Sequence, residues 1–400
     1  MSAAMTANRG PLAGVQVLDF TSLYPGPLAT MLLADLGAEV IRIDSPSRPD
    51  MLRYLPPYDA EEVGAAYRTL GRNKKALCLD LKHPKAKGVI ENLVRNADVV
   101  VEQFRPGVMQ RLGLGYDQLK VWRPDIIYCA ISSYGQTGPE RDRAGHDINF
   151  LARSGLSHHI GRTGQGPVPL ATLIGDVAGG TWPAVTGILA ALIHRQQSGE
   201  GQFIDISMAD GSLLMNTLAI TQALHGGGDL GPEQHSLSGA TVYDYYQCAD
   251  GRWLAVGALE DKFYAQLLEG LDLPDLADQW MAHGKDAQRQ KTQVADAIRS
   301  KPLAHWRAVF SKLDCCVEPV CTPSEVIADP LFHHREMLVD VPTADGDAQT
   351  QVGNPIQLRG SPPTYRHTGP LTGQDSEEVL RKAGLSDAEI ANLKESGALG

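Results

Sequence analysis

One histidine and two carboxylates occupy positions in this sequence from which a protein can move protons. His146 lies in the segment Gly145–Asn149, just past a predicted strand and at the start of a helical pattern. Asp176 stands among small and apolar residues at the entry of another predicted helix, and Glu260 follows another predicted strand. Imidazole and carboxyl groups act as general acids and bases when burial and neighbouring charges bring their pKa values towards neutral pH. We therefore take His146, Asp176 and Glu260 as candidate catalytic residues.

Each of these residues also has a purely structural interpretation. Asp176 is well placed to be a helix N-cap, a role that stabilises a helix by roughly 0.5–2 kcal/mol. A single Glu after a strand, such as Glu260, usually faces solvent. The chain has 12 histidines, and His158 and His159 lie close enough in sequence to be alternatives to His146. Residue types and spacing leave these alternatives open.

The elements that must position these residues are short apolar runs alternating with helical patterns. Strands are predicted over 15–20, 39–44, 76–81, 98–104, 125–132 and 202–207, with helices at 85–96, 116–122, 179–194 and 211–224 and one ending near Leu36. This rhythm predicts a mostly parallel, Rossmann-like sheet with helices on both faces, which is the α/β class. Ligands of such sheets bind beyond the carboxyl ends of the strands, where His146 is expected. A helix start there also offers free backbone N–H groups that favour negative charge.

The pattern changes after about residue 225. The glycine-rich segment 225–229 predicts a domain boundary. Paired strands at 242–248 and 253–256, with helices near 261–271, 289–300 and 303–313, predict a smaller α+β domain over 230–330. We expect the large domain to comprise 1–225, with 331–400 returning to it and helical over 376–399.

Composition narrows the classes of function. A net charge of −11 argues against a general nucleic-acid-binding protein. No run reaches the roughly 18 apolar residues of a membrane span, and Met1–Leu12 does not have the pattern of a signal peptide. Six cysteines without zinc spacing predict neither a disulfide framework nor a metal site. We expect a cytoplasmic protein with no nucleic-acid and no membrane partner.

The common nucleotide and hydrolase motifs do not supply a function. The sequence has no P-loop, no G-x-S-x-G and no H-E-x-x-H. A G-x-G-x-x-G pattern over 226–231 follows a helix rather than a strand, where it has no phosphate-binding mechanism. The chemistry must therefore come from less regular features.

Several longer segments are similar to those of one protein family. They are 11–19 (PLAGVQVLD), 34–41 (ADLGAEVI), 79–82 (LDLK), 105–108 (RPGV), 111–115 (RLGLG), 135–139 (GQTGP) and 384–390 (GLSDAEI). The chain resembles the family III CoA-transferases over nearly its whole length and, within that superfamily, the α-methylacyl-CoA racemases. The G-H-D-I-N segment at 145–149, the G-D pair at 175–176 and Glu260 are similar to the racemase pattern.

The resemblance implies racemisation of 2-methylacyl-CoA thioesters, an isomerase reaction of lipid metabolism. His146 and Asp176 would remove and return the α-proton on opposite faces, through an enolate whose oxygen needs fixed hydrogen-bond donors. Glu260 would orient His146. The alternative is a CoA-transferase, in which Asp176 carries the acyl group as a mixed anhydride between two carboxylic acids. Transferases usually have a different residue, often Tyr, where His146 stands, whereas the segment 72–75 is more similar to transferases.

The resemblance also implies a coenzyme A site and an interlocked homodimer with the active site at its interface. The acyl-CoA substrate would need no cofactor beyond its own coenzyme A moiety. Its expected contacts are Leu79, Asp80, Leu81, Lys82, Gln103, Phe104, Arg105, Arg111, Gly145, Asp147, Ile148 and Asn149. Lys82, Arg105 and Arg111 offer positive charge to its phosphates. Lys74 and Lys75 either add to that charge or are solvated surface lysines.

Overall fold

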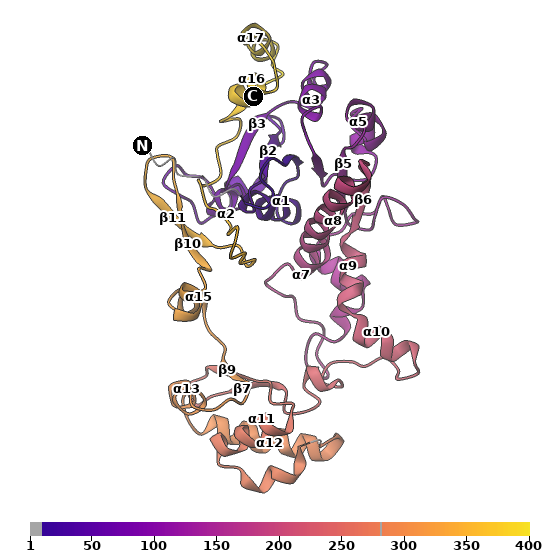
Figure 1. Ribbon diagram of the computed structural model, residues 1–400. Coiled ribbons are helices and arrows are strands. Elements are labelled where there is room, and N and C mark those ends of the chain that lie inside the picture. Colours follow the sequence, from indigo (N-terminus) through magenta and orange to yellow (C-terminus); the bar gives the residue numbers. More distant parts are fainter. Residues whose placement is uncertain (1–9, 281) are drawn as a thin grey trace. The chain divides into compact units, whose positions relative to one another are not determined.

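The computed structural model describes residues 10–280 and 282–400, which divide into two compact units (Figure 1). The first unit takes the chain up to Ser154, then Leu170–Met215 and Leu331–Gly400. The second takes Gly155–Pro169 and Asn216–Pro330. These boundaries differ from the expected 1–225 and 230–330, because Gly155–Pro169 groups with the second unit and the change of unit falls after Met215.

A six-stranded parallel sheet forms the centre of the first unit. Its strands are β1 (Gln16–Phe20), β2 (Glu39–Asp44), β3 (Lys74–Cys78), β4 (Val99–Glu102), β5 (Ile127–Ser132) and β6 (Phe203–Ser207). The strand order is β3-β2-β1-β4-β5-β6, and every neighbouring pair is parallel. The predicted α/β class and parallel sheet are thus confirmed. The order reverses between β1 and β4, and ligands of open sheets bind at such a switch point.

Helices cover both faces of this sheet, as expected. One face packs against α1 (Pro25–Asp35) and α8 (Trp182–Ser198), and the other against α3 (Ala86–Val94), α5 (Tyr116–Trp122) and α17 (Asp387–Glu395). In β4 the side chains alternate between the two cores, because successive strand residues point to opposite faces. Val99 and Val101 belong to the first core and Val100 to the second.

The remaining helices of the first unit have at most eight residues each. They are η1 (Met51–Tyr54), α2 (Ala65–Leu70), α4 (Val108–Arg111), α6 (Asp147–Arg153), α7 (Ile174–Asp176), the π-helical segment η3 (Val177–Thr181), α9 (Met208–Met215), α15 (Pro330–His334) and α16 (Ser376–Lys382). A hairpin of β10 (Leu338–Pro342) and β11 (Ala348–Val352) was not predicted. The helix predicted over 211–224 is instead α9 and α10 (Thr217–Leu224). The break falls at Asn216, which is buried and whose side chain contacts His159 at 3.2 Å.

The second unit has its own sheet and core. The antiparallel strands β7 (Asp244–Gln247), β8 (Trp253–Val256) and β9 (Val317–Pro319) pack with α11 (Asp261–Leu271), α12 (Gly284–Arg299) and α13 (Leu303–Phe310). Shorter helices are η2 (Leu156–His158), η4 (Ser236–Ser238), η5 (Pro274–Gln279) and α14 (Pro323–Ile327). The first two strands were predicted, but β9 is only three residues long and was not.

The C-terminal segment belongs to the first unit and closes the edge of its sheet. Leu399 forms an isolated bridge with Leu79, and the Asp80 N–H donates to the Ala398 carbonyl at 2.9 Å. The Ala76 N–H donates to the Asp375 carboxylate at 2.9 Å. The chain just after β3, which the sequence suggested as a coenzyme A contact, is therefore fixed by the tail.

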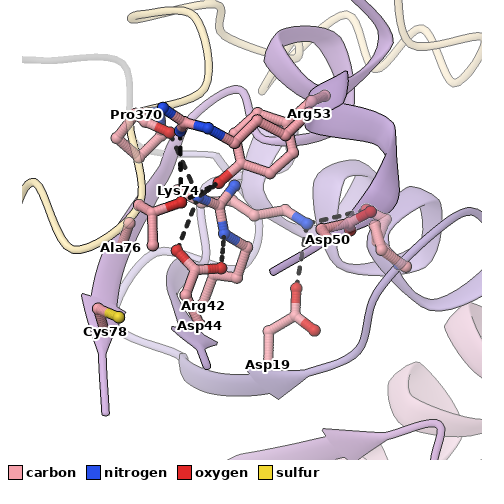
Figure 2. A network of polar contacts seen from close by, with 12 residues as sticks. Asp19, Arg42, Asp44, Asp50, Arg53, Lys74, Ala76, Cys78 and Pro370 are labelled. Atoms are coloured by element: carbon pink, nitrogen blue, oxygen red, sulfur yellow. Dashed lines mark hydrogen bonds and ion pairs between the residues drawn. The ribbon is translucent and has the colours of Figure 1, made fainter. Parts of the chain in front are cut away.

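Buried charges join the strands near the switch point (Figure 2). Lys74 Nζ donates to Asp19 at 3.0 Å, to Thr30 at 2.7 Å and to the Pro27 carbonyl at 2.9 Å. Arg42 binds both oxygens of Asp44, at 2.8 and 3.0 Å. We call Asp19, Arg42, Asp44 and Lys74 the buried charge cluster.

The lysines flagged in the sequence have structural contacts of their own. Lys74 is fully buried and its ammonium group donates to three protein acceptors, so both of its expected roles were wrong. Lys75 pairs with Glu378 instead. Positive charge for a ligand must come from other residues.

One helical stretch of the described residues, Ile174–Ser198, is long and apolar enough to cross a membrane by length and composition. Mean hydropathy tolerates polar residues, so this stretch passes although no uninterrupted apolar run was found. Its buried residues Ala184, Val185, Ile188, Ala191 and Leu192 belong to the core on one face of the parallel sheet. It is packed as a core helix.

Candidate active site

His146 stands at the start of α6, beyond the carboxyl end of β5. Its backbone N–H donates to the Asn149 side chain at 3.0 Å, and its carbonyl accepts the Asn149 N–H at 2.8 Å. These reciprocal bonds fix the helix start. A Cβ on Gly145 would lie 2.6 Å from the Phe150 ring, so only glycine fits before His146. The His146 side chain is exposed.

The structure brings Asp176 to the same place. Asp147, the first residue of α6, is 8% exposed, and its Oδ1 accepts the backbone N–H of Asp176 at 3.0 Å. A Cβ on Gly175 would lie 3.2 Å from that same oxygen, so a glycine permits the close approach. The segment Gly145–Asn149 and the pair Gly175–Asp176 are therefore joined by a hydrogen bond that spans 29 positions of the sequence.

The surroundings of Asp176 oppose its ionisation. Desolvation is the largest cause and the Asp147 charge adds to it, whereas the charge of His146 acts the other way, and together they raise the pKa of Asp176 to about 6. The imidazole of His146 and this carboxyl group therefore interact electrostatically. A carboxyl group with this pKa can both accept and donate a proton close to neutral pH.

Asp176 does not serve as a helix N-cap. It is the last residue of α7 and runs directly into η3, and its side chain makes no capping hydrogen bond. The π-helical turn depends on a close backbone contact, because a Cβ on Gly211 would lie 2.4 Å from the Gly179 carbonyl oxygen. Segments of π-helix are rare and occur frequently at functional sites. The structural alternative for Asp176 is thus excluded.

The other candidate residues are placed as follows. Glu260 belongs to the second unit, where it is exposed and precedes α11. His159 is held by the Leu230 carbonyl at 2.9 Å and by Asn216 at 3.2 Å, which gives it a structural role in that unit. His158 is exposed and stacks edge-on against His159. Of the three histidines considered, His146 is the one that directly precedes Asp147, the residue that binds the Asp176 backbone.

The expected coenzyme A contacts follow the carboxyl ends of three strands of the parallel sheet. The segment 79–82 follows β3, the segment 103–105 follows β4, and Gly145–Asn149 comes after β5. At the switch point, Gln103 Oε1 accepts the Gly26 N–H at 2.9 Å and so joins the β4 loop to the start of α1. A Cβ on Gly26 would lie 2.7 Å from Gln103 Oε1, so this contact needs glycine.

Three cations lie free beside these segments. Lys82, Arg105 and Arg111 are exposed, and within residues 10–280 and 282–400 none of them forms an ion pair. Exposed cations without an acidic partner are suited to phosphate groups. Leu79, by contrast, is fully buried, and its N–H donates to the Asp44 carbonyl at 2.9 Å.

Two features of the site were missed in the sequence. The side chain of Asp147 was expected to meet coenzyme A, but it holds the Asp176 backbone. Glu102, which precedes the expected contact Gln103, is a buried carboxylate that no motif indicated. Its position as the last residue of a strand at the switch point was the one available signal. In the described part of the chain, no cluster of three or more His, Cys, Asp or Glu could hold a metal.

Comparison with known proteins gives a consistent result. Residues 12–376 match CoA-transferase family III. The chain is 35% identical to alpha-methylacyl-CoA racemase of Homo sapiens, with 96% of each chain covered. It is 30% identical to succinyl-CoA--D-citramalate CoA-transferase of Chloroflexus aurantiacus, over 96% of this chain and 97% of that protein. The crystal structure of a CAIB/BAIF family protein from Brucella suis superposes with a TM-score of 0.82 at 25% identity, covering 94% of this chain and 100% of that one.

The fold and site define an α/β protein with a candidate acid–base site beyond the carboxyl ends of its parallel strands. The chain belongs to the family III CoA-transferases, as its resemblance implied. Its relatives are enzymes that include both racemases and CoA-transferases.

Proposed function

We propose that this protein racemises 2-methylacyl-CoA thioesters by removing the α-proton and returning it to the opposite face. The observation that carries the proposal is Asp176, whose pKa is raised to about 6 and whose backbone N–H is bound by Asp147, the residue after His146. Inversion at a carbon next to a thioester carbonyl needs two groups that can each take up or release a proton near neutral pH. An acyl-transfer nucleophile needs only to be ionised, so the raised pKa favours the racemase.

The two groups exchange roles between the two stereoisomers. With neutral His146 and protonated Asp176, the imidazole takes the α-proton and the carboxyl group returns one from the other face. With protonated His146 and ionised Asp176, the same steps run in reverse. The pair needs one proton in total, so catalysis requires neither an added acid nor an added base.

The enolate that forms between the two proton transfers needs hydrogen-bond donors. The N–H groups of Asp147 and Ile148 begin α6, where no carbonyl of that helix can accept them. Donors fixed before the reaction stabilise a developing oxyanion without reorganising. We assign the thioester oxygen to this helix start, and Glu260 to orienting His146.

Coenzyme A would lie along the segments that follow β3, β4 and β5, with Lys82, Arg105 and Arg111 near its phosphates. The substrate carries the coenzyme A moiety itself, so no further cofactor is proposed. A racemase relative at 35% identity over 96% of the chain supports this assignment.

CoA transfer between carboxylic acids is the second candidate. Transferase relatives that are 30–32% identical over most of the chain favour it. In that reaction Asp176 attacks the thioester carbonyl, the C–S bond breaks, and coenzyme A leaves as the thiolate. The acyl group remains on Asp176 as a mixed anhydride until an acceptor carboxylate displaces it.

One experiment separates the two reactions. A single enantiomer of a 2-methylacyl-CoA is incubated with the protein, with and without an acceptor acid, and the product is analysed on a chiral column. We expect loss of stereochemical purity without any acceptor. Retained configuration, combined with an acyl group on Asp176 that hydroxylamine traps, would instead establish the transferase.

We further propose a homodimer, interlocked as in the family it resembles. Exposed apolar side chains occur on α9 in the first unit, where Leu214 is 73% exposed, and on α10 in the second, where Leu224 is 77% exposed. Apolar surface of this kind marks protein interfaces. Light scattering after gel filtration is expected to give twice the chain mass, and a monomer at micromolar concentration would contradict the proposal.

A further inference from the structure

Glu102 is a buried carboxylate at the switch point that the proposed chemistry does not use. It is the last residue of β4 and is 4% exposed. Its strand lies next to β1, where the sheet order reverses. The expected coenzyme A contacts Gln103, Phe104 and Arg105 follow it directly in the chain.

Two hydrogen bonds hold the Glu102 carboxyl group. Its Oε2 accepts the Phe104 N–H at 2.7 Å, and its Oε1 accepts the Tyr128 hydroxyl at 3.4 Å. Tyr128 is itself fixed, because it is fully buried and its ring stacks on Phe203 with 5.4 Å between ring centroids. The carboxyl group therefore connects a rigid side chain of β5 to the backbone of the β4 loop.

No cation compensates this carboxylate. In the described residues Glu102 forms no ion pair, and Phe104 and Tyr128 are its hydrogen-bonding partners. Desolvation raises its pKa to about 7. In the buried charge cluster, Asp19 lies within 3.0 Å of Lys74. A neutral residue at position 102 would avoid the cost of burying the charge, so the carboxylate is expected to serve the loop it holds.

We propose that Glu102 is a positioning residue of the coenzyme A site, whose carboxyl group fixes the Phe104 N–H and thereby the conformation of Gln103–Arg105. This inference rests on the coenzyme A binding of the proposed function. The loop is also tied at Gln103, which accepts the Gly26 N–H at 2.9 Å. Loss of the Glu102 tie would leave Phe104 and Arg105 free to move while Gln103 stays held.

The groups around Glu102 allow its titration to be distinguished from theirs. Burial raises the pKa of Tyr128 and of Cys129, so both stay neutral between pH 6 and pH 8. The residue opposite Glu102 on β1 is the apolar Phe20. On the adjoining loop and α4, Arg105 and Arg111 are exposed and, in the described chain, unpaired with it. The ionised carboxylate accepts the Phe104 N–H more strongly than the protonated one, so affinity is expected to rise from pH 6 to pH 8.

The test measures binding of coenzyme A itself by isothermal titration calorimetry at pH 6, 7 and 8. Glu102→Leu removes the acceptor, and Glu102→Gln keeps an acceptor oxygen but does not titrate. Tyr128→Phe removes only the second tie. Glu91→Gln, at an exposed ion pair of α3, is the matched control.

We expect Glu102→Leu to weaken binding at pH 8 about tenfold, the effect of a hydrogen bond to a charged group. A turnover assay is expected to show the loss in KM with kcat changed less than about twofold. Tyr128→Phe should weaken binding about two- to threefold. Glu102→Gln should bind within about twofold of wild type at pH 7, with a smaller rise from pH 6 to pH 8 than wild type and Glu91→Gln show.

The outcomes separate this inference from the proposed function. Wild-type protein that does not bind coenzyme A would overturn the proposed function, and this inference with it. Wild type that binds, with Glu102→Leu folded and equal to it, would overturn this inference alone. If Glu102→Leu does not fold, the pH dependence of Glu102→Gln and the affinity of Tyr128→Phe decide, and wild-type behaviour of both would overturn it.

Discussion

Carboxylates are removed from solvent in two parts of the first unit, and the consequences for their charge are opposite. In the buried charge cluster, Asp19 lies 3.0 Å from Lys74 and Asp44 lies 2.8 Å from Arg42. In the candidate active site, Asp176 has the carboxylate of Asp147 beside it, and its pKa rises to about 6. The first arrangement fixes charges and joins strands. The second leaves a group free to change its protonation state near neutral pH.

The comparison also explains why sequence similarity alone did not choose between the two reactions. The segment 72–75 was more similar to transferases, but Arg72 is fully buried and binds both oxygens of Asp35, at 2.9 and 2.7 Å. Lys74 belongs to the buried charge cluster. Arg72 and Lys74 therefore have packing roles in the fold, whereas His146 and Asp176 carry the proposed chemistry.

The largest effect is expected from Asp176→Asn. An amide cannot exchange the proton, so kcat/KM for racemisation should fall by roughly 10²–10⁴-fold. The free energy of unfolding should stay the same or rise, because a desolvated carboxyl group is removed. Chiral analysis of the product and urea unfolding check both. Asp117→Asn, an exposed carboxylate on α5, is the control, and an active Asp176→Asn would contradict the proposed role.

The opposite pattern is expected in the buried charge cluster. Asp19→Asn leaves the buried Lys74 without its counter-charge and should lower the free energy of unfolding by about 3–5 kcal/mol. Lys74→Met should have a similar effect. The double variant Asp19→Asn with Lys74→Met should lose much less than the sum of the single variants. Additive losses in urea unfolding would show that the pair is not coupled.

Glu102 is buried without a counter-charge, unlike the carboxylates of the buried charge cluster. Its burial should therefore be visible in how the free energy of unfolding changes with pH. Its folded pKa of about 7 exceeds the ordinary value of 4.5, so the folded state keeps a proton that the unfolded state has released. The stability it contributes is full below about pH 4.5 and is lost as pH rises to about 7, by about 3 kcal/mol. Glu102→Gln should remove this loss and be the more stable protein at pH 8. If the free energy of unfolding changed with pH in parallel for wild type and Glu102→Gln, Glu102 would not be a buried, uncompensated carboxylate.

The smallest effect is expected from a variant of Asp147, and it tests how the Asp147 charge acts on Asp176. Asp147→Asn keeps an oxygen that can accept the Asp176 N–H but removes the negative charge. The pKa of Asp176 should therefore fall, and the acid side of the pH profile of kcat/KM should move to lower pH. Asp147→Ala, which also loses the hydrogen bond, should lower the rate at every pH. An unmoved profile in Asp147→Asn would mean that the Asp147 charge does not act on Asp176.

Much of the fold was predictable because its signals are local. The strand over 39–44 and the helices over 116–122 and 261–271 have the predicted bounds, since each shows a clear apolar period between breaking residues. The strand β9 has three residues and carries no such pattern. The strand predicted over 76–81 is β3, which starts at Lys74, because a lysine does not read as a buried strand residue unless its partner Asp19 is known.

The site was predictable in residue types but not in its pairings. The position of His146 followed from the strand before it and the helix after it. The contact between Asp147 and Asp176 joins residues 29 positions apart, and the Tyr128–Glu102 contact joins residues on adjacent strands 26 apart. Such contacts depend on the strand order, which a single sequence does not specify. The long-range partners of a charged residue, rather than its type, decide whether it is structural or reactive.

The most direct test of the central claim is solvent deuterium incorporation at the α-carbon of a 2-methylacyl-CoA, without any acceptor acid. Wild-type protein in D₂O is compared with His146→Ala by mass spectrometry of the recovered thioester. Proton transfer by His146 predicts α-exchange in wild type and its loss in His146→Ala. No exchange in wild type with several 2-methylacyl groups, or unchanged exchange without His146, would contradict it.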